Sequence, residues 1–435
     1  MATHLKHATP KTREGSTSTD VSSVVANVIA DVRTQGDTAV REYSAKFDQW
    51  SHASFRLSPE EIDATISRVP AQTLEDIRTA QENVRRFAQL QLESLSDFEA
   101  EVEPGVLLGQ KNIPVNAVGA YVPGGRYPLL ASAHMTIVTA KVAGVERVAA
   151  ATPAARGVIP DASVAAMHLA GADEIYLLGG VQAVAALALG TETIAAVDIL
   201  VGPGNAYVAE AKRQLFGEVG IDLFAGPTEV LIVADETADP LLTAVDLLSQ
   251  AEHGPDSPAV LVTTSKDLAE RTLAEIDRLL PGLPTGEVAG QAWREHGEVI
   301  LAESLAEAYQ ITDEYASEHV QILTQDPREA LDALTNYGAL FLGENTCVSF
   351  GDKVIGTNHV LPTRKAARYT GGLWVGKYLK TVTYQEVTSP AASGELGELL
   401  GRAARAENFE GHARSGDLRA ARRDGTLPSW AQAGR

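Results

Sequence analysis

The sequence predicts an α/β protein in which two doubly wound units follow each other, with a helical arm before them and a helical tail after them. Two patterns support this fold class. Between residues 114 and 380, short apolar runs alternate with alanine-rich helical stretches, which is typical of parallel sheets covered on both faces. On both flanks, apolar residues instead recur at helical spacing. The length of 435 residues allows two to three domains at about 150 residues each.

The helical arm is expected over residues 1–113. Apolar residues recur at helical spacing over 21–47 and form a longer amphipathic pattern over 72–92. Between them, Ser58 precedes Pro59 and two acidic residues. This is a helix start, because proline suits the first helical position and acids suit the first turn.

The first α/β unit is expected over 114–235 and the second over 236–380. In the first unit the strand-like runs are 115–122, 145–150, 174–178 and 197–201, and the helical runs are 128–143, 162–170, 181–189 and 206–216. A second series of strand-like runs begins just before the boundary, at 230–234, and continues with 259–263, 298–301, 320–324 and 339–342, and its helical runs are 240–250, 266–280, 304–311 and 327–335. The tail, 381–435, is expected to form helices over 393–406 and 409–423.

The composition narrows the class of function. Asp and Glu number 57 against 36 for Lys and Arg, which gives a net charge of −21. General binding to nucleic acid or to anionic membranes is therefore not expected, because both need a positive field. The single cysteine, Cys347, excludes a disulfide framework and a cysteine zinc cluster, and it fits a reducing compartment. With no secretory signal and no long apolar run, we expect a cytoplasmic protein without a membrane span.

Two glycine-rich segments each lie between an expected strand and an expected helix. They are GAYVPGG at 119–125 and GPGNAY at 202–207. Glycine permits close backbone approach, and the following helix N-terminus attracts phosphate. Neither segment matches the G-x-G-x-x-G dinucleotide pattern, so spacing alone leaves open a ligand contact or an ordinary turn.

Amide, carboxyl and imidazole side chains occur at positions that suit a metal or an acid–base site. Gln250 and His253 are three residues apart at an expected helix end and so share one face. They can begin a metal site, or His253 can simply interact with the helix dipole. Glu318 and His319 are both capable general acid–base groups, or an exposed pair at a strand start.

Asp352 and His359 lie in a glycine-punctuated stretch that ends in proline, and His412 lies on the expected tail helix. Loops of this kind often present functional groups, although Asp and Asn also serve ordinary turns. Together, Gln250, His253, Asp352 and His412 offer one amide oxygen, one carboxylate and two imidazoles. That mixture suits zinc or a similar divalent ion without thiolates.

Six sequence blocks resemble the histidinol dehydrogenase family. They are GAYVPGG at 119–125, VGPGN at 201–205, AGPTE at 225–229, LSQAEHGP at 248–255, SEH at 317–319 and GTNHVLPT at 356–363. The resemblance covers nearly the whole chain. It implies two Rossmann-like domains with helical arms, and a homodimer in which the tail completes the partner's site. It also implies zinc and two NAD, used to oxidise a primary alcohol through an aldehyde to a carboxylate.

The resemblance also implies roles for individual residues. The metal ligands would be Gln250, His253, Asp352 and His412. The catalytic pair would be Glu318 and His319. Contacts to NAD would come from Tyr121, Gln182 and Asn205. Contacts to the substrate would come from Thr228, His319, His359 and Glu407, where Thr228 stands at a position that serine often occupies.

The sequence departs from the histidinol-specific enzymes around the expected substrate. His134 stands where an apolar residue is usual and becomes a candidate substrate contact, and Arg414 adds a basic group in the tail. Residues 364–380 contain five basic and no acidic side chains, which indicates an anionic substrate or a solvated basic face. These segments resemble the sulfopropanediol 3-dehydrogenase branch, which oxidises 2,3-dihydroxypropane-1-sulfonate to sulfolactate. Arginine suits a sulfonate because it offers fixed, charged donors. Histidinol remains the alternative substrate, and an inactive ligand-binding relative is the remote alternative.

Overall fold

The computed structural model describes residues 2–9, 17–124, 128–154, 157–224 and 226–432. Gly125 and Ala225, which lie at the ends of two of the motifs above, fall outside these residues. The chain divides into two compact units, each described here by itself. The larger unit comprises Met1–Leu92 and Val115–Tyr378, and the smaller comprises Glu93–Pro114 and Leu379–Arg435. Among the described residues, no helix is both long and apolar enough to cross a membrane.

The first sheet of the larger unit has five strands that all pair in parallel. In spatial order they are β6 (Glu174–Leu177), β5 (Arg147–Thr152), β4 (Ala117–Tyr121), β7 (Ile199–Val201) and β8 (Gly220–Ile221). Every residue of β4 is buried, as expected for a central strand covered on both faces. The covering helices nearby in sequence are α7 (Asp161–Ala170), α8 (Gly180–Leu189) and α9 (Ala206–Leu215).

Helices of the N-terminal segment pack mainly against the helices that cover this first sheet. They are α1 (Thr17–Gln35), α2 (Asp37–Tyr43), a π-helix (Ser44–Asp48), α3 (Pro59–Ile66) and α4 (Ala71–Glu93). Val25, Val28 and Val32 of α1 belong to the same core as Ala149 and Leu187. Ser58 caps α3 through a reciprocal capping box with Glu61, as its sequence predicts.

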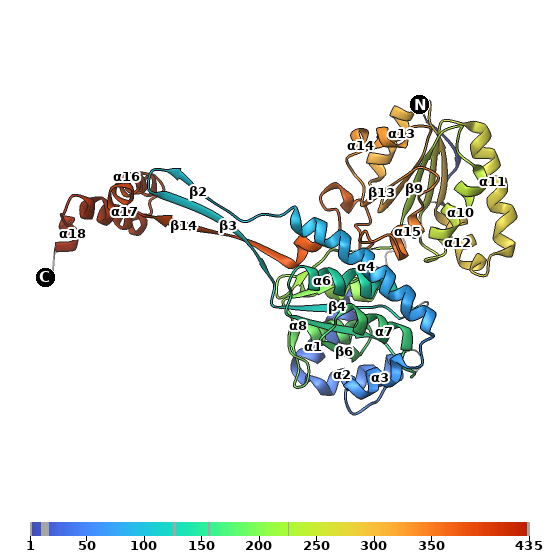
Figure 1. Ribbon diagram of the computed structural model, residues 1–435, viewed down its shortest axis with the longest axis horizontal. Coiled ribbons are helices and arrows are strands. Elements are labelled where there is room, and N and C mark those ends of the chain that lie inside the picture. The colour runs from blue at the N-terminus through green and yellow to red at the C-terminus, as the bar shows by residue number, and fades with distance from the viewer. Residues whose placement is uncertain (1, 10–16, 125–127, 155–156, 225, 433–435) are drawn as a thin grey trace. The chain divides into compact units, whose positions relative to one another are not determined.

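The second sheet has six strands in the order β1, β11, β10, β9, β12, β13. Their bounds are Thr3–Lys6, Gly297–Leu301, Ala259–Thr263, Val230–Ala234, His319–Leu323 and Ala339–Leu342. All pairs are parallel except the edge strand β1, which runs antiparallel to β11. One face is covered by α10 (Pro240–Ala251), α11 (Lys266–Leu279) and α12 (Gly286–His296), and the other by α13 (Leu305–Tyr315) and α14 (Ala330–Ala333) (Figure 1). The predicted mixed α/β class with parallel sheets is thus confirmed.

The smaller unit corrects the expectation of an all-helical arm and tail. It contains an antiparallel sheet in the order β14 (Leu379–Val387), β3 (Val106–Pro114), β2 (Phe98–Glu103). Every residue of β2 is exposed, but its sequence FEAEVE alternates apolar and acidic residues, which is the period-two pattern of a strand that the helical expectation overlooked. Helices α16 (Pro390–Ala406), α17 (Glu410–Arg423) and α18 (Ser429–Gln432) complete this unit.

Two local expectations in the larger unit also differ from the structure. The single helix expected over 128–143 is α5 (Leu130–Ala133), a π-helix (His134–Val138) and α6 (Thr139–Val142). Asp352, expected on a loop, lies in the short helix α15 (Val348–Lys353). Six residues are too few to show a helical period, and glycine at 351 suggests a turn. This glycine is required because a Cβ there would lie 2.7 Å from the Phe341 ring.

Candidate active site

The larger unit brings three of the four predicted metal ligands together. Helix α10 begins at the Asp239 cap and ends just after Gln250, and Glu252 and His253 follow. Gln250 Nε2 donates to Asp352 Oδ2 at 3.2 Å, and His253 Nε2 lies 3.7 Å from the same oxygen. The Oε1 atom of Gln250 is buried and has no hydrogen-bond partner among the described residues. An unsatisfied buried acceptor beside a carboxylate and an imidazole is a fitting place for a divalent cation.

The fourth predicted ligand, His412, belongs to the smaller unit, where it is exposed on α17. Glu407 is in the same unit, at the C-cap of α16. Among the described residues, no group of three or more His, Cys, Asp and Glu side chains is placed so that it could hold a metal ion.

His319 is the first residue of β12, and its ring orientation is fixed by the chain. Its Nδ1 lies 3.0 Å from the carbonyl oxygen of Glu229, which can only accept a hydrogen bond, so Nδ1 carries the proton. The opposite atom, Nε2, is buried without a hydrogen-bond partner among the described residues and lies 3.4 Å from Asp352 Oδ1. The Nε2 atom therefore faces the carboxylate that joins Gln250 and His253.

Glu318 lies directly beside this ring. Its Oε2 accepts the N–H of Glu229 at 3.0 Å and lies 3.6 Å from His319 Nδ1. Burial raises the pKa of Glu318 to about 8, and nearby Asp352 adds to the increase while His319 opposes it. Glu318 can therefore hold or release a proton near neutral pH.

His319 and Asp352 shift each other's pKa values in opposite directions. Burial opposes the charged imidazolium, but the carboxylates of Glu318 and Asp352 outweigh burial and raise the pKa of His319 to about 9. Burial also opposes ionisation of Asp352, but His253 and His319 hold the pKa of this carboxyl far below its usual range. A cation beside Asp352 would lower the pKa of His319 by charge repulsion and favour the free Nε2 lone pair.

Three further predicted substrate residues lie in the larger unit. His359 donates from Nδ1 to the Asp352 carbonyl at 2.9 Å, and burial lowers the pKa of His359 to about 4, so the ring is neutral. His134 is buried, and its Nδ1 accepts from Gln81 Nε2 at 3.1 Å. Burial lowers the pKa of His134 to about 4, and the neighbouring His359 disfavours a second imidazolium beside it. Thr228 lies next to Glu229 and is partly buried.

The predicted NAD residues lie at the carboxyl edge of the first sheet. The chain runs outward from the central strand β4 to β5 and β6 on one side, and then continues to β7 and β8 on the other side. Dinucleotides bind at the carboxyl edge where the strand order reverses in this way. Tyr121 ends β4, and its hydroxyl accepts the N–H of Gly180 at 3.0 Å. Gln182 is buried in α8, whereas Asn205 is exposed and caps α9 through the N–H groups of Tyr207 and Val208.

Sequence reasoning missed the residues that hold this edge in place. Asp48 Oδ2 accepts the Gly179 N–H at 3.0 Å and Gln182 Nε2 at 3.2 Å. A buried ion pair of Lys212 and Asp222 holds Gly202, because Lys212 donates to its carbonyl at 2.9 Å and Asp222 accepts its N–H at 2.7 Å. No sequence signal indicates Asp48.

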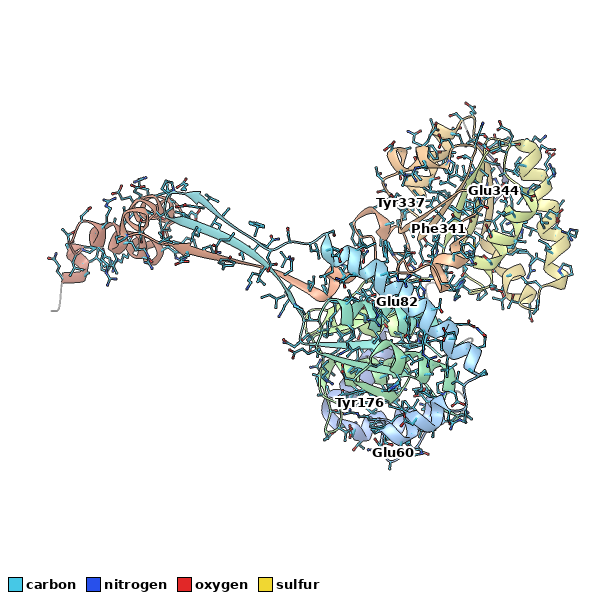
Figure 2. All side chains as sticks on the ribbon, viewed as in Figure 1. Glu60, Glu82, Tyr176, Tyr337, Phe341 and Glu344 are labelled. Carbon is cyan, nitrogen blue, oxygen red and sulfur yellow. The ribbon has the colours of Figure 1, made fainter. Side chains whose placement is uncertain are left out.

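Glu229 was also missed, although it lies within the quoted AGPTE block. Its main chain contacts both members of the predicted catalytic pair. An acidic residue directly before a buried strand is the one signal that could have drawn attention to it. Figure 2 shows Phe341 among the strands of the second sheet, and its ring lies 6.0 Å from that of His319.

Known proteins resemble this chain over nearly its whole length. Residues 11–420 match the family model described as histidinol dehydrogenase. A histidinol dehydrogenase homolog of Shouchella clausii is 60% identical over 97% of this chain and 99% of that protein. The sulfopropanediol 3-dehydrogenase of Ruegeria pomeroyi is 50% identical over 94% of each chain. The crystal structure of histidinol dehydrogenase from Elizabethkingia anophelis matches with a TM-score of 0.89 at 33% identity, covering 95% of this chain and 94% of that one. The chain therefore belongs to the histidinol dehydrogenase family of oxidoreductases.

Proposed function

We propose that this protein is an NAD-dependent dehydrogenase that oxidises a primary alcohol through an aldehyde to a carboxylate, with 2,3-dihydroxypropane-1-sulfonate as its substrate and 3-sulfolactate as its product. The observation that carries the chemistry is the buried, unpartnered Nε2 of His319 beside Asp352 and Gln250. The 50% identity with a sulfopropanediol 3-dehydrogenase supports the substrate. So does the basic composition of residues 364–380 in an otherwise acidic chain.

The proposed chemistry is a four-electron oxidation in two stages. NAD, when bound, supplies the hydride acceptor, and two NAD and one water are consumed for each alcohol. His319 Nε2 removes the hydroxyl proton in the first stage. Glu318 then takes a proton from the water that adds to the aldehyde, for which its pKa of about 8 is well suited.

Zinc is the metal that the family implies, and Gln250, His253 and Asp352 would hold it, with His412 as the fourth ligand. When bound, zinc supplies Lewis acidity that makes the alcohol proton easier to remove. Amide, carboxylate and imidazole donors fit this metal. Tyr121, Gln182 and Asn205 would contact NAD at the carboxyl edge of the first sheet, and we propose that both sheets are doubly wound Rossmann-like units. Thr228, His359, His134 and Glu407 would contact the substrate.

We also propose that two chains form a homodimer, and that the smaller unit of one chain supplies His412 and Glu407 to the other. The smaller unit leaves apolar side chains in solvent, among them Phe98, Val102, Leu399 and Phe409. Apolar exposure on a small sheet and helical pair is a feature of surfaces that pack against another chain. A cytoplasmic location remains an expectation.

The test is a side-by-side assay of purified protein with NAD, using 2,3-dihydroxypropane-1-sulfonate in one arm and L-histidinol in the other. We expect two NADH per sulfonate molecule and a kcat/KM at least about a hundredfold higher than for histidinol, since charged-group recognition supplies discrimination of that order. Preference for histidinol would reject the proposed substrate and retain the dehydrogenase. No turnover of either alcohol by zinc-loaded protein would favour an inactive ligand-binding relative.

A further inference from the structure

Two segments that are far apart in sequence are joined beside the catalytic pair. One is the segment 226–229, which leads into β9. The other consists of Thr363, Arg364 and Lys365 and is called the basic loop below. The N–H of Gly226 donates to Thr363 Oγ1, and the N–H of Arg364 donates to Glu229 Oε1 at 2.8 Å.

The backbone of the basic loop is held in an unfavourable conformation. Arg364 has φ 53° and Lys365 has φ 66°, so two successive residues with side chains occupy the left-handed region. This region is disfavoured for residues other than glycine, and such residues persist only where neighbouring contacts impose them. The two hydrogen bonds with segment 226–229 are such contacts, on either side of the bond between Thr363 and Arg364. Strained backbone of this kind is concentrated at ligand-binding sites.

The side chains of the basic loop carry two positive charges, and the nearby carboxylate with which they interact is that of Glu229, where the charge of Arg364 partly offsets the rise in pKa that burial causes. Arg364 and Lys365 are exposed, and neither forms an ion pair within the part of the chain that the structure describes. The guanidinium of Arg364 lies over the Phe224 ring at 5.9 Å from its centroid. A Cβ at Gly226 would overlap the Arg364 side chain, so this glycine lets the arginine lie against the backbone. The guanidinium therefore lies against the Phe224 ring and the backbone at Gly226, and its donors have no hydrogen-bond acceptor among the residues that the structure describes.

Glu229 connects this loop to the catalytic pair. Its carboxylate holds the basic loop, its N–H donates to Glu318 Oε2 at 3.0 Å, and its carbonyl accepts from His319 Nδ1 at 3.0 Å. Glu229 thus joins the backbone of the basic loop directly to the two groups that would act on the alcohol.

We propose that the basic loop binds the anionic end of the substrate, and that Glu229 is the positioning residue that holds the loop. This inference rests on the proposed function and deepens it, because it assigns recognition of a sulfonate to Arg364 and Lys365. An anion bound here leaves the hydroxyl-bearing end of the same small molecule free to reach His319. Thr363 and Gly226 act as the second attachment of the loop.

The first test compares Arg364→Met with Arg368→Met. The second variant also removes one positive charge from the basic stretch 364–380, but at a position outside the basic loop. Calorimetry measures the binding of 3-sulfolactate and of glycerate, which carries the same hydroxy acid without the sulfonate. We expect Arg364→Met to weaken 3-sulfolactate binding about 30-fold, within the range of a lost charge-assisted hydrogen bond. Glycerate binding by Arg364→Met, and 3-sulfolactate binding by Arg368→Met, should change less than about threefold. Equal losses in the two variants, or equal losses for the two ligands, would overturn the proposal.

The second test concerns the positioning role. Gln at 229 can still accept the Arg364 N–H, whereas Ala cannot. We expect Glu229→Gln to keep 3-sulfolactate affinity within about threefold, and Glu229→Ala to lose about tenfold with NAD affinity unchanged. Unaltered 3-sulfolactate binding by a folded Glu229→Ala variant would contradict the role. Equal losses in both variants would contradict it too.

These binding measurements separate the inference from the proposed function. If wild-type protein oxidises no alcohol yet binds 3-sulfolactate through Arg364, the proposed function fails and the loop assignment holds. If it oxidises the sulfonated alcohol with a KM that does not change in Arg364→Met, the loop assignment fails alone.

Discussion

The two sheets of the larger unit carry their predicted functional residues at opposite edges. In the first sheet, the predicted cofactor residues lie at the carboxyl edge, after the ends of the strands. The N–H of Gly180 donates to the Tyr121 hydroxyl there. In the second sheet, Glu229 and His319 stand at the amino ends of β9 and β12, which are paired from Val230 and His319 onward. Helix α10 returns to that same edge and delivers Gln250.

The difference teaches that each edge suits a different task. At the carboxyl edge of the first sheet, the backbone turns at Gly179 and Gly202 are held by the buried side chains of Asp48, Lys212 and Asp222. Such turns suit an extended, phosphate-containing ligand. The amino edge of the second sheet offers titratable side chains with shifted pKa values, which suits proton transfer. Mutations at the first edge should therefore affect NAD binding, whereas mutations at the second should affect kcat.

The largest expected effect is at the second edge. His319→Asn removes the Nε2 lone pair, so we expect kcat to fall about 10³-fold in both oxidation stages, in line with general-base losses. Glu318→Gln should slow the aldehyde stage by about 10²-fold and the alcohol stage far less. The two stages are measured separately by supplying the alcohol or the aldehyde. Equal losses in both stages for Glu318→Gln would contradict the water-activation role.

Next is the buried pair behind the first edge. Lys212→Met leaves the carboxylate of Asp222 buried without its partner, so we expect a loss of about 3–5 kcal/mol in the free energy of unfolding. Urea unfolding measures this loss. The double variant Lys212→Met/Asp222→Leu is the control, and it should recover most of the stability while NAD binding stays weak, because Gly202 is no longer held. Full recovery of NAD binding in the double variant would show that the pair does not position this edge.

A smaller effect concerns His134. Its folded pKa of about 4 lies below the ordinary value of 6.5, so the unfolded chain binds the extra proton between these values. Stability should therefore fall as the pH drops from 6.5 to 4, by up to about 3 kcal/mol from this residue. His134→Asn can still accept from Gln81 and does not titrate. Unfolding curves at pH 7 and pH 4 should show a smaller difference for this variant, and an unchanged difference would refute the assignment.

The smallest expected effect is at Asp48. Asp48→Ala leaves the Gly179 N–H and the Gln182 amide without an acceptor, so we expect the KM for NAD to rise about tenfold with kcat nearly unchanged. Asp48→Asn keeps an acceptor oxygen and serves as the control. A fall in kcat without a change in the KM for NAD would place Asp48 outside the cofactor edge.

Much of the larger unit could be predicted from the sequence because its strands are buried on both faces and its helices are strongly periodic. The strands around Val230 and Ala259 are uniformly apolar and lie as expected. The strand Phe98–Glu103 was missed although its apolar and acidic residues alternate, because the helical patterns on either side of it led to one helical arm over the whole segment. The π-helix at His134 was hidden because its residues are compatible with an ordinary helix.

The candidate site divides in the same way. Gln250 and His253 could be paired from their spacing along one helix, whereas the meeting of both with Asp352 depends on tertiary packing. The role of Glu229 in holding His319 comes from its main chain, and main-chain contacts leave no trace in residue type.

X-ray absorption at the zinc edge of the zinc-loaded protein tests the central claim most directly. The expected result is one zinc per subunit with only nitrogen and oxygen ligands at about 2.0–2.2 Å, including imidazole scattering from two histidines. Failure to bind zinc, or a sulfur ligand at about 2.3 Å from Cys347, would contradict the account.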